Sequence, residues 1–261
     1  MCYDDQARPP IPPGGGGGGA AAGEELVLTA SDGNRFAAYL AMPAKPSGAN
    51  VLIYPDVRGL HQFYKELALR FAEVGIGALA IDYFGRTAGL TSRDEPFEYM
   101  PHVQQLQFDT ISLDTQAALS YLHEKAGPTM PTFIVGFCMG GSLTLLTGTN
   151  ASLNLAGLMA FYAGVTRNFA GKGTMLDNAT QVAYPVLGLF GEEDQGIPPS
   201  ALKELDEKLD IAGVEHDIVV YPGAPHSFFD RRAADFAEAS ADAWQRMLTF
   251  VSAHSQPVQA A

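Results

Sequence analysis

One cysteine of this chain lies in a pattern that could make it a nucleophile. Cys138 is the central residue of Gly136-Phe-Cys-Met-Gly140, which directly follows the short β-favouring run 133–135. The spacing Gly-x-Cys-x-Gly matches a nucleophile elbow, a sharp strand-to-helix turn in which serine is the usual central residue. Glycines on either side leave room for the chain to bend and for a substrate carbonyl to approach. The pattern therefore predicts that Cys138 is a nucleophile.

A nucleophilic cysteine needs a base or a positive field, because the thiol is mostly protonated at neutral pH. His226, in the Gly- and Pro-bounded loop after the last expected strand, is the best-placed base. Asp194 would accept a hydrogen bond from one ring nitrogen and stabilise the imidazolium. Glu192 and Glu193 compete with Asp194 for this role, and Asp194 could instead cap the following helix. The order nucleophile, acid, histidine is typical of α/β-hydrolases.

Alternating strands and helices must position these residues. Apolar runs predict strands at 51–54, 78–81, 133–135, 156–161, 184–190 and 217–221, and the segments 26–29 and 36–40 predict a β-hairpin around Asp32-Gly33-Asn34. Helices are expected at 61–74, 103–124, directly after Cys138, and at 199–211 and 233–253. Two irregular segments, 82–101 and 165–183, are expected to be loops over the site.

This order of elements predicts an α/β fold, with a mostly parallel central sheet, an N-terminal antiparallel hairpin and helices on both faces. Ligands of such sheets bind beyond the carboxyl ends of the strands. Asp56, Cys138, Asp194 and His226 all fall at those ends. We expect a single domain over residues 24–254 and a flexible tail over 255–261. Residues 1–23, rich in Pro and Gly, are expected to be a disordered tail. Their glycine run is not expected to be a phosphate loop, because no Gly-Lys-Ser/Thr follows it.

Composition excludes several classes of function. The formal net charge of −13 disfavours nucleic acid and anionic membranes as partners. No apolar run reaches the roughly 18 residues of a membrane span, and the N-terminus does not resemble a signal peptide. Two cysteines, Cys2 and Cys138, cannot build a disulfide framework, which fits a reducing, cytoplasmic setting. The other histidines lack the spacing of a metal site, so we expect neither metal nor cofactor.

Three motifs together resemble the dienelactone hydrolase family, the carboxymethylenebutenolidases, of the α/β-hydrolase fold. They are Gly-Phe-Cys138-Met-Gly-Gly, Gly-Glu-Glu-Asp194-Gln-Gly-Ile-Pro and Ala-Pro-His226-Ser-Phe, and the resemblance extends over about residues 26–250. It implies a Cys-His-Asp triad that opens a cyclic enol ester to a dicarboxylic product. The expected partner is accordingly a small ester or lactone, with anionic substrates among the candidates, and the expected intermediate is an acyl-cysteine.

The resemblance also implies further site residues. The backbone N–H groups of Val57 and Met139 would form an oxyanion hole. Asp56 stands where the family has an acidic residue near the resting thiol, although a glutamate is expected there. Family members bind a substrate carboxylate with arginines. The candidates here are Arg58, Arg86, Arg93 and Arg231, and Tyr99 and Tyr162 are candidates to line the pocket.

Two other functions are compatible with the same residues. One is a general carboxylesterase or thioesterase, which would prefer acyclic, uncharged esters. The other is a non-catalytic binding or redox-sensing protein in which Cys138 is reversibly oxidised. The presence of Asp194 and His226 disfavours this second function. The sequence does not indicate an oligomeric state.

Overall fold

The apolar runs of the sequence form the strands of one mixed sheet in the computed structural model, which describes residues 7–15, 22–94 and 96–255. The strands are β1 (Ala22–Thr29), β2 (Arg35–Met42), β3 (Asn50–Tyr54), β4 (Gly77–Ile81), β5 (Thr132–Phe137), β6 (Gly157–Phe161), β7 (Val186–Gly191) and β8 (His216–Tyr221). Their order across the sheet is β1-β2-β4-β3-β5-β6-β7-β8. β2 is antiparallel to β1 and β4, and all other neighbours are parallel. This arrangement confirms the predicted fold class.

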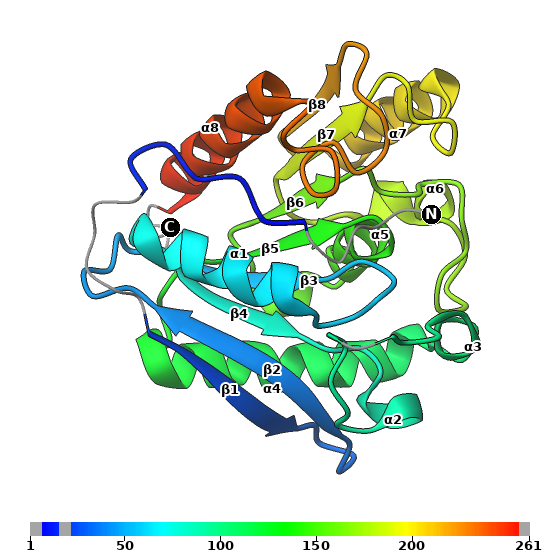
Figure 1. The fold of residues 1–261 in the computed structure, drawn as a ribbon. Helices are drawn as coiled ribbons and strands as arrows, with labels where there is room; N and C mark the ends of the chain where they lie inside the picture. Colours follow the sequence, from blue (N-terminus) through cyan, green and yellow to red (C-terminus); the bar gives the residue numbers. More distant parts are fainter. Residues whose placement is uncertain (1–6, 16–21, 95, 256–261) are drawn as a thin grey trace, which may run out of the picture.

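Helices cover both faces of the sheet (Figure 1). The helices are α1 (Gln62–Glu73), α4 (Phe108–Ala126), α5 (Met139–Thr147), α7 (Pro199–Ala212) and α8 (Ala237–His254), with short turns at α2 (Gly85–Ala88), α3 (Met100–Val103), α6 (Met175–Asn178), η1 (Ala151–Leu153) and η2 (Ala179–Gln181). On one face α1 meets α8, where the rings of Phe71 and Trp244 are 4.9 Å apart. On the other face the Tyr54 hydroxyl of β3 contacts Thr115 of α4 and Thr147 of α5. No described helix is long and apolar enough to cross a lipid bilayer.

The central strands form the core. Every residue of β3, β4, β5, β6 and β7 is buried, as their uninterrupted apolar sequences predict for strands covered by helices on both sides. In β2, near the edge of the sheet, buried residues largely alternate with more exposed ones. The carboxyl ends of β3, β5, β6 and β7 are therefore rigid points from which loops can hold functional side chains.

Helix α4 begins later than the sequence predicts. We expected a helix from about residue 103, but α3 ends at Val103 and α4 starts at Phe108. Gln107 has an extended backbone, and the Phe108 N–H donates to the Ala170 carbonyl at 2.9 Å. The Phe108 N–H thus bonds to a distant loop at the point where we expected the helix to be already formed. The local apolar spacing does not reveal this long-range bond.

Part of the segment predicted to be a disordered tail packs on the α1 and α8 face. Residues 7–15 lie along the domain: the Trp244 indole N–H donates to the Pro10 carbonyl at 2.9 Å, and Arg8 pairs with Glu66 at 3.3 Å. Pro9 and Pro12 are buried. Strand β1 also begins, at Ala22, inside the predicted tail. The rest of that prediction, residues 1–6 and 16–21, and residues 256–261 of the C-terminal tail lie outside the described residues.

Candidate active site

The turn that carries Cys138 connects β5 to α5. Cys138 has φ 55° and ψ −116°, a backbone conformation that is costly for a residue with a side chain. Its N–H donates to the Phe161 carbonyl of β6 at 3.1 Å, and the residue is half-buried. A buried strand on one side and a buried helix on the other hold the strained residue in place. This is the geometry of a nucleophile elbow.

The two glycines of the motif are required by close backbone contacts. A Cβ atom on Gly136 would lie 2.2 Å from the carbonyl oxygen of Gly140. A Cβ atom on Gly140 would lie 2.2 Å from the Pro55 carbonyl oxygen and 2.3 Å from that of Tyr54. Glycine is therefore needed both to bend the chain and to let the start of α5 pass against the end of β3.

Val57 lies two residues after Pro55, whose carbonyl is approached by Gly140 in the first turn of α5. Met139 is the first residue of α5, where helical N–H groups have no intrahelical acceptor. Among the described residues, neither the Val57 N–H nor the Met139 N–H has a hydrogen-bond acceptor. N–H groups without a protein acceptor are what an oxyanion hole requires.

His226 and Asp194 are brought together from loops after β8 and β7. His226 Nδ1 lies 2.5 Å from Asp194 Oδ2, and the Asp194 side chain is 4% exposed. His226 Nε2 is buried and, among the described residues, has no hydrogen-bond partner. The tautomer with hydrogen on Nδ1 is favoured by the carboxylate, which leaves a lone pair on Nε2. Asp194 therefore fixes the orientation of the imidazole through Nδ1.

The structure distinguishes Asp194 from its competitors. Asp194 Oδ1 accepts a hydrogen bond from the Gly196 N–H at 2.9 Å, which fixes the loop. The residue that caps α7 is Pro198, so Asp194 does not cap this helix. Glu192 and Glu193 are exposed, and Glu192 Oε2 accepts from the Gly223 N–H.

Asp56 is part of a buried ionic group next to Val57. Its oxygens accept hydrogen bonds from the Arg58 backbone N–H at 2.8 Å and from Arg58 Nη2 at 2.9 Å, and His61 Nε2 lies 3.6 Å from Oδ2. Burial acts to raise the pKa of Asp56, but His61 and Arg58 outweigh it and hold this pKa well below the usual value. The carboxylate is therefore ionised, with Arg58 and His61 beside it.

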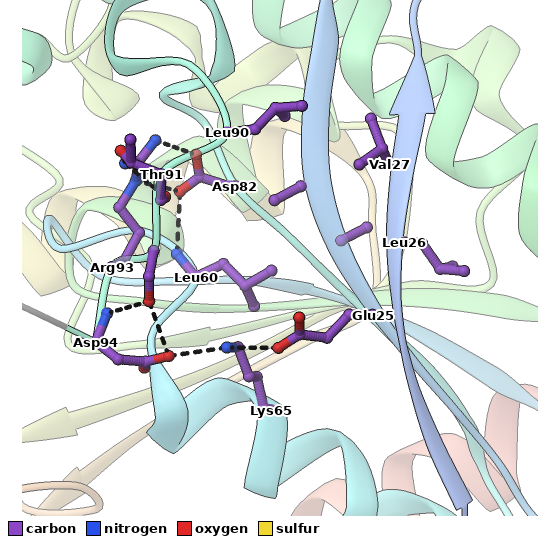
Figure 2. A pocket seen from close by; sticks show the side chains of 13 residues that line it. Glu25, Leu26, Val27, Leu60, Lys65, Asp82, Leu90, Thr91, Arg93 and Asp94 are labelled. Atoms are coloured by element: carbon purple, nitrogen blue, oxygen red, sulfur yellow. Dashed lines mark hydrogen bonds and ion pairs between the residues drawn. The ribbon is translucent and has the colours of Figure 1, made fainter.

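Two of the candidate arginines are engaged in ion pairs with carboxylates of other segments. Arg86 donates to Asp32 in the hairpin turn and to Asp114 in α4, the latter at 2.8 Å. Arg93 donates to Asp82 at 3.0 Å and forms part of a cavity of about 320 Å³ beside β1 and β2 (Figure 2). Arg86 thus links α2 to the hairpin turn and to α4, and Arg93 links its loop to the end of β4.

The other candidates lie in different places. Arg58 follows Val57 directly, and Arg231 lies five residues after His226. Tyr162, at the end of β6, is fully buried, and its ring centroid is 4.8 Å from that of His226. Tyr99 is half-buried at the start of α3.

The sequence did not identify Asp230 as a site residue. It is buried, and its Oδ2 accepts a hydrogen bond from the Tyr162 hydroxyl at 3.0 Å. The available signal was an acidic residue four positions after His226, directly after two phenylalanines, because a carboxylate in an apolar loop needs a partner. Within the described part of the chain, no group of three or more His, Cys, Asp or Glu residues could hold a metal ion.

Comparison with known proteins gives consistent matches. The model of the dienelactone hydrolase family matches residues 36–255. A carboxymethylenebutenolidase of Methylorubrum extorquens is 31% identical over 224 residues, covering 80% of this chain and 74% of the relative. A protein of the same name from Yersinia pestis is 28% identical over 235 residues, covering 86% of each.

A solved structure is similar over nearly its whole length. The crystal structure of a dienelactone hydrolase from Klebsiella pneumoniae has a TM-score of 0.78 and 26% identity, and the match covers 89% of this chain and 99% of that one. The names of all three proteins carry the qualifier "putative".

Proposed function

The chain belongs to the dienelactone hydrolase family and is a hydrolase of that family, and we propose that it cleaves a small ester or lactone through an acyl-cysteine intermediate. In this proposal Cys138 is the nucleophile, His226 the general base and acid, and Asp194 the residue that orients His226. The observation that carries it is the 2.5 Å contact of His226 Nδ1 with buried Asp194, with Nε2 left without a hydrogen-bond partner among the residues that the structure describes. Cys138 on its strained turn supplies the nucleophile.

The proposed reaction has two halves. His226 Nε2 takes the thiol proton, and the sulfur of Cys138 attacks the ester carbonyl carbon to form a C–S bond. The N–H groups of Val57 and Met139 stabilise the resulting oxyanion. As the C–O bond breaks, His226 gives the proton to the leaving oxygen, which in a lactone stays attached to the acyl chain. Water, deprotonated by His226, then attacks the thioester and releases the acid and the thiol.

Membership of this family favours a lactone as substrate, of the dienelactone type in which a cyclic enol ester is opened. An anionic substrate is part of the proposal, since its carboxylate could approach Arg231 in the His226 loop. Arg58, next to Val57, is buried and already paired with Asp56, so it would bind a substrate carboxylate only by leaving that pair. The second candidate function is a general carboxylesterase or thioesterase that uses the same three residues, because the elbow geometry does not itself select a ring.

A panel of substrates tests both functions. Turnover of an anionic dienelactone, the uncharged lactone dihydrocoumarin, p-nitrophenyl acetate and an acyl thioester should be compared for the wild type, Cys138→Ala and Cys2→Ala. We expect the dienelactone to have the highest kcat/KM, Cys138→Ala to be inactive and Cys2→Ala to match the wild type. Acid-quenched mass spectrometry should find the acyl group on Cys138.

Each alternative has a distinct result in this panel. A higher kcat/KM for p-nitrophenyl acetate or the thioester than for both lactones would favour the general esterase. Turnover by Cys138→Ala would refute the acyl-cysteine mechanism. Because this mechanism needs a reduced thiol, the proposal also includes a cytoplasmic location. Finding the native protein in a secreted fraction would contradict that part alone.

A further inference from the structure

A buried tyrosine–aspartate pair lies against the imidazole of His226. The Tyr162 hydroxyl donates to Asp230 Oδ2 at 3.0 Å, and the Tyr162 ring centroid is 4.8 Å from the His226 ring centroid. Tyr162 is 0% exposed and Asp230 is 4% exposed. The proposed chemistry uses neither side chain. A hydrogen bond between two such buried groups therefore needs another explanation.

The backbone on both sides of this contact is unusual. Tyr162 has φ 36° and Ser227, directly after His226, has φ 62°, both in the region that favours glycine. Strain of this kind persists only where surrounding contacts fix the conformation. The Tyr162 N–H donates to the Leu189 carbonyl of β7 at 2.8 Å, which ties its backbone to the sheet. Tyr162 is thus held at its backbone by β7 and at its hydroxyl by Asp230.

Asp230 has charged and titratable neighbours on several elements. Asp56 and Arg58 interact with it from the loop after β3, Tyr64 from α1 and Tyr162 from the end of β6. In its own loop, the Arg231 N–H donates to Oδ1. Burial and the charge of Asp56 raise the pKa of Asp230 to about 7, although Arg231, Tyr162 and Arg58 act to lower it. In either protonation state the carboxyl group can hydrogen-bond the Tyr162 hydroxyl.

We propose that Tyr162 and Asp230 are positioning residues for His226, an inference that rests on the proposed function of His226 as the base. Asp194 fixes the edge of the imidazole through Nδ1, but one hydrogen bond leaves the ring able to tilt about it. The Tyr162 ring limits this tilt, and Asp230 keeps the Tyr162 ring in place. The pair thereby maintains the direction in which Nε2 points.

The alkylation rate of Cys138 measures this positioning without any substrate. At pH 6.5 a thiolate exists mainly if His226 stabilises it as an ion pair, whereas at pH 9.5 the thiolate forms without help. The rate of reaction of Cys138 with iodoacetamide should be followed by peptide mass spectrometry in a Cys2→Ala background. The variants are Tyr162→Phe, Asp230→Ala, Asp230→Asn and His226→Ala. Thermal unfolding of each variant shows whether it is folded.

We expect Tyr162→Phe and Asp230→Ala each to slow alkylation about tenfold at pH 6.5 and less than twofold at pH 9.5, because small displacements of a catalytic group cost up to about 10²-fold. Asp230→Asn, which keeps a hydrogen bond to Tyr162, should stay within about threefold of the wild type at both pH values. The double variant Tyr162→Phe/Asp230→Ala should be no slower than the slower single variant, because the two residues act as one unit.

Tyr221→Phe is the matched control. Its hydroxyl donates to Asp242 at 2.9 Å, so this variant removes the same kind of bond from a tyrosine whose ring packs on Phe228 rather than on the imidazole, and its rates should equal those of the wild type. If Asp230→Ala does not fold, Tyr162→Phe, which keeps the ring, still decides the question.

Two outcomes would overturn the inference, and they can be told apart. If His226→Ala slows alkylation at pH 6.5 but Tyr162→Phe does not, the pair has no positioning role and the proposed function stands. The same conclusion follows if Tyr162→Phe is equally slow at both pH values, since that indicates altered access to the thiol. If His226→Ala itself reacts like the wild type, His226 is not the base, and the role of the pair fails together with the proposed function.

Discussion

Two buried carboxylates of this protein follow parallel strands but have different partners. Asp194 follows β7 and binds His226, whereas Asp82 follows β4 and binds Arg93 (Figure 2). Asp82 receives four hydrogen bonds: from the N–H groups of Leu60 and Phe84, and from Nε and Nη2 of Arg93. The oxygens of Asp194 accept from Gly196 and contact His226.

The two sites differ in whether the partner of the carboxylate, Arg93 or His226, has a buried ring or guanidinium nitrogen without a hydrogen bond. Arg93 also donates to the carbonyls of Gly89 and Thr91, and its guanidinium lies 4.4 Å from the Phe97 ring centroid. A guanidinium is permanently charged, so this ion pair is complete and has no proton to exchange. The imidazole of His226 can change its protonation state, and its Nε2 is buried without a partner among the described residues. A buried carboxylate that follows a strand thus forms a complete ion pair at Asp82, whereas at Asp194 it holds an imidazole that, in our proposal, does chemistry.

The largest expected effect is on turnover, from Asp194→Asn. An amide at this position would favour the wrong imidazole tautomer, so kcat should fall on the order of 10⁴-fold while the melting temperature changes little. Steady-state kinetics on the best ester of the panel measures this. Glu193→Gln, an exposed neighbour, is the control and should be unchanged. A fall in kcat of less than tenfold for Asp194→Asn would show that Asp194, like Asp82, does not serve the chemistry.

The second-largest expected effect is a loss of stability in the variant Arg93→Met. This variant leaves Asp82, which is 1% exposed, without its cation, and the free energy of unfolding should fall by about 3–5 kcal/mol. Urea denaturation measures the loss, and kcat of the folded protein should stay within about twofold. Arg70→Met, which breaks a half-exposed pair with Glu73, should cost less than about 1 kcal/mol. A large fall in kcat for Arg93→Met would show that this ion pair also serves the chemistry.

A third carboxyl group, that of Asp230, should make the free energy of unfolding depend on pH. Its pKa of about 7 in the folded protein lies above the unfolded value of 3.8, so its contribution to stability is present at acidic pH and is lost as the pH rises through 7. Asp230→Asn does not titrate. The stability of this variant relative to the wild type should therefore increase by about 2–3 kcal/mol between pH 5 and pH 8. Urea denaturation at both pH values tests this, and a constant difference would contradict it.

The smallest effect should come from Lys65→Met at the cavity of Figure 2. Lys65 Nζ lies 3.0 Å from Glu25 Oε1 and 2.9 Å from Asp94 Oδ2, and the Glu25 side chain is 73% exposed. Pairs with such exposed partners contribute about 0–1 kcal/mol, and salt weakens them further. Unfolding at low and high salt should show a loss of at most about 1 kcal/mol that shrinks in high salt. A loss above 3 kcal/mol would place Lys65 with Arg93 as a structural residue.

Much of the fold was predictable because its signals are local. Uninterrupted apolar runs marked the buried strands, and the Asp32-Gly33-Asn34 turn marked the hairpin. Predictions failed where a distant contact set a boundary, as at Phe108, whose N–H bonds to Ala170. The packing of residues 7–15 likewise depends on Trp244, more than 200 residues away. Local composition could not indicate such partners.

The sequence alone therefore determined the family, the strand pattern and the elbow around Cys138, since side-chain alternation, glycine sterics and motif order are properties of neighbouring residues. Only the tertiary structure decided which charged groups pair. It joined His226 to Asp194 across 32 residues and Tyr162 to Asp230 across 68, and it gave Arg86 and Arg93 carboxylate partners. The physical reason is that the energy of a charge depends on its burial and its nearest partner, and both are fixed only when distant segments pack.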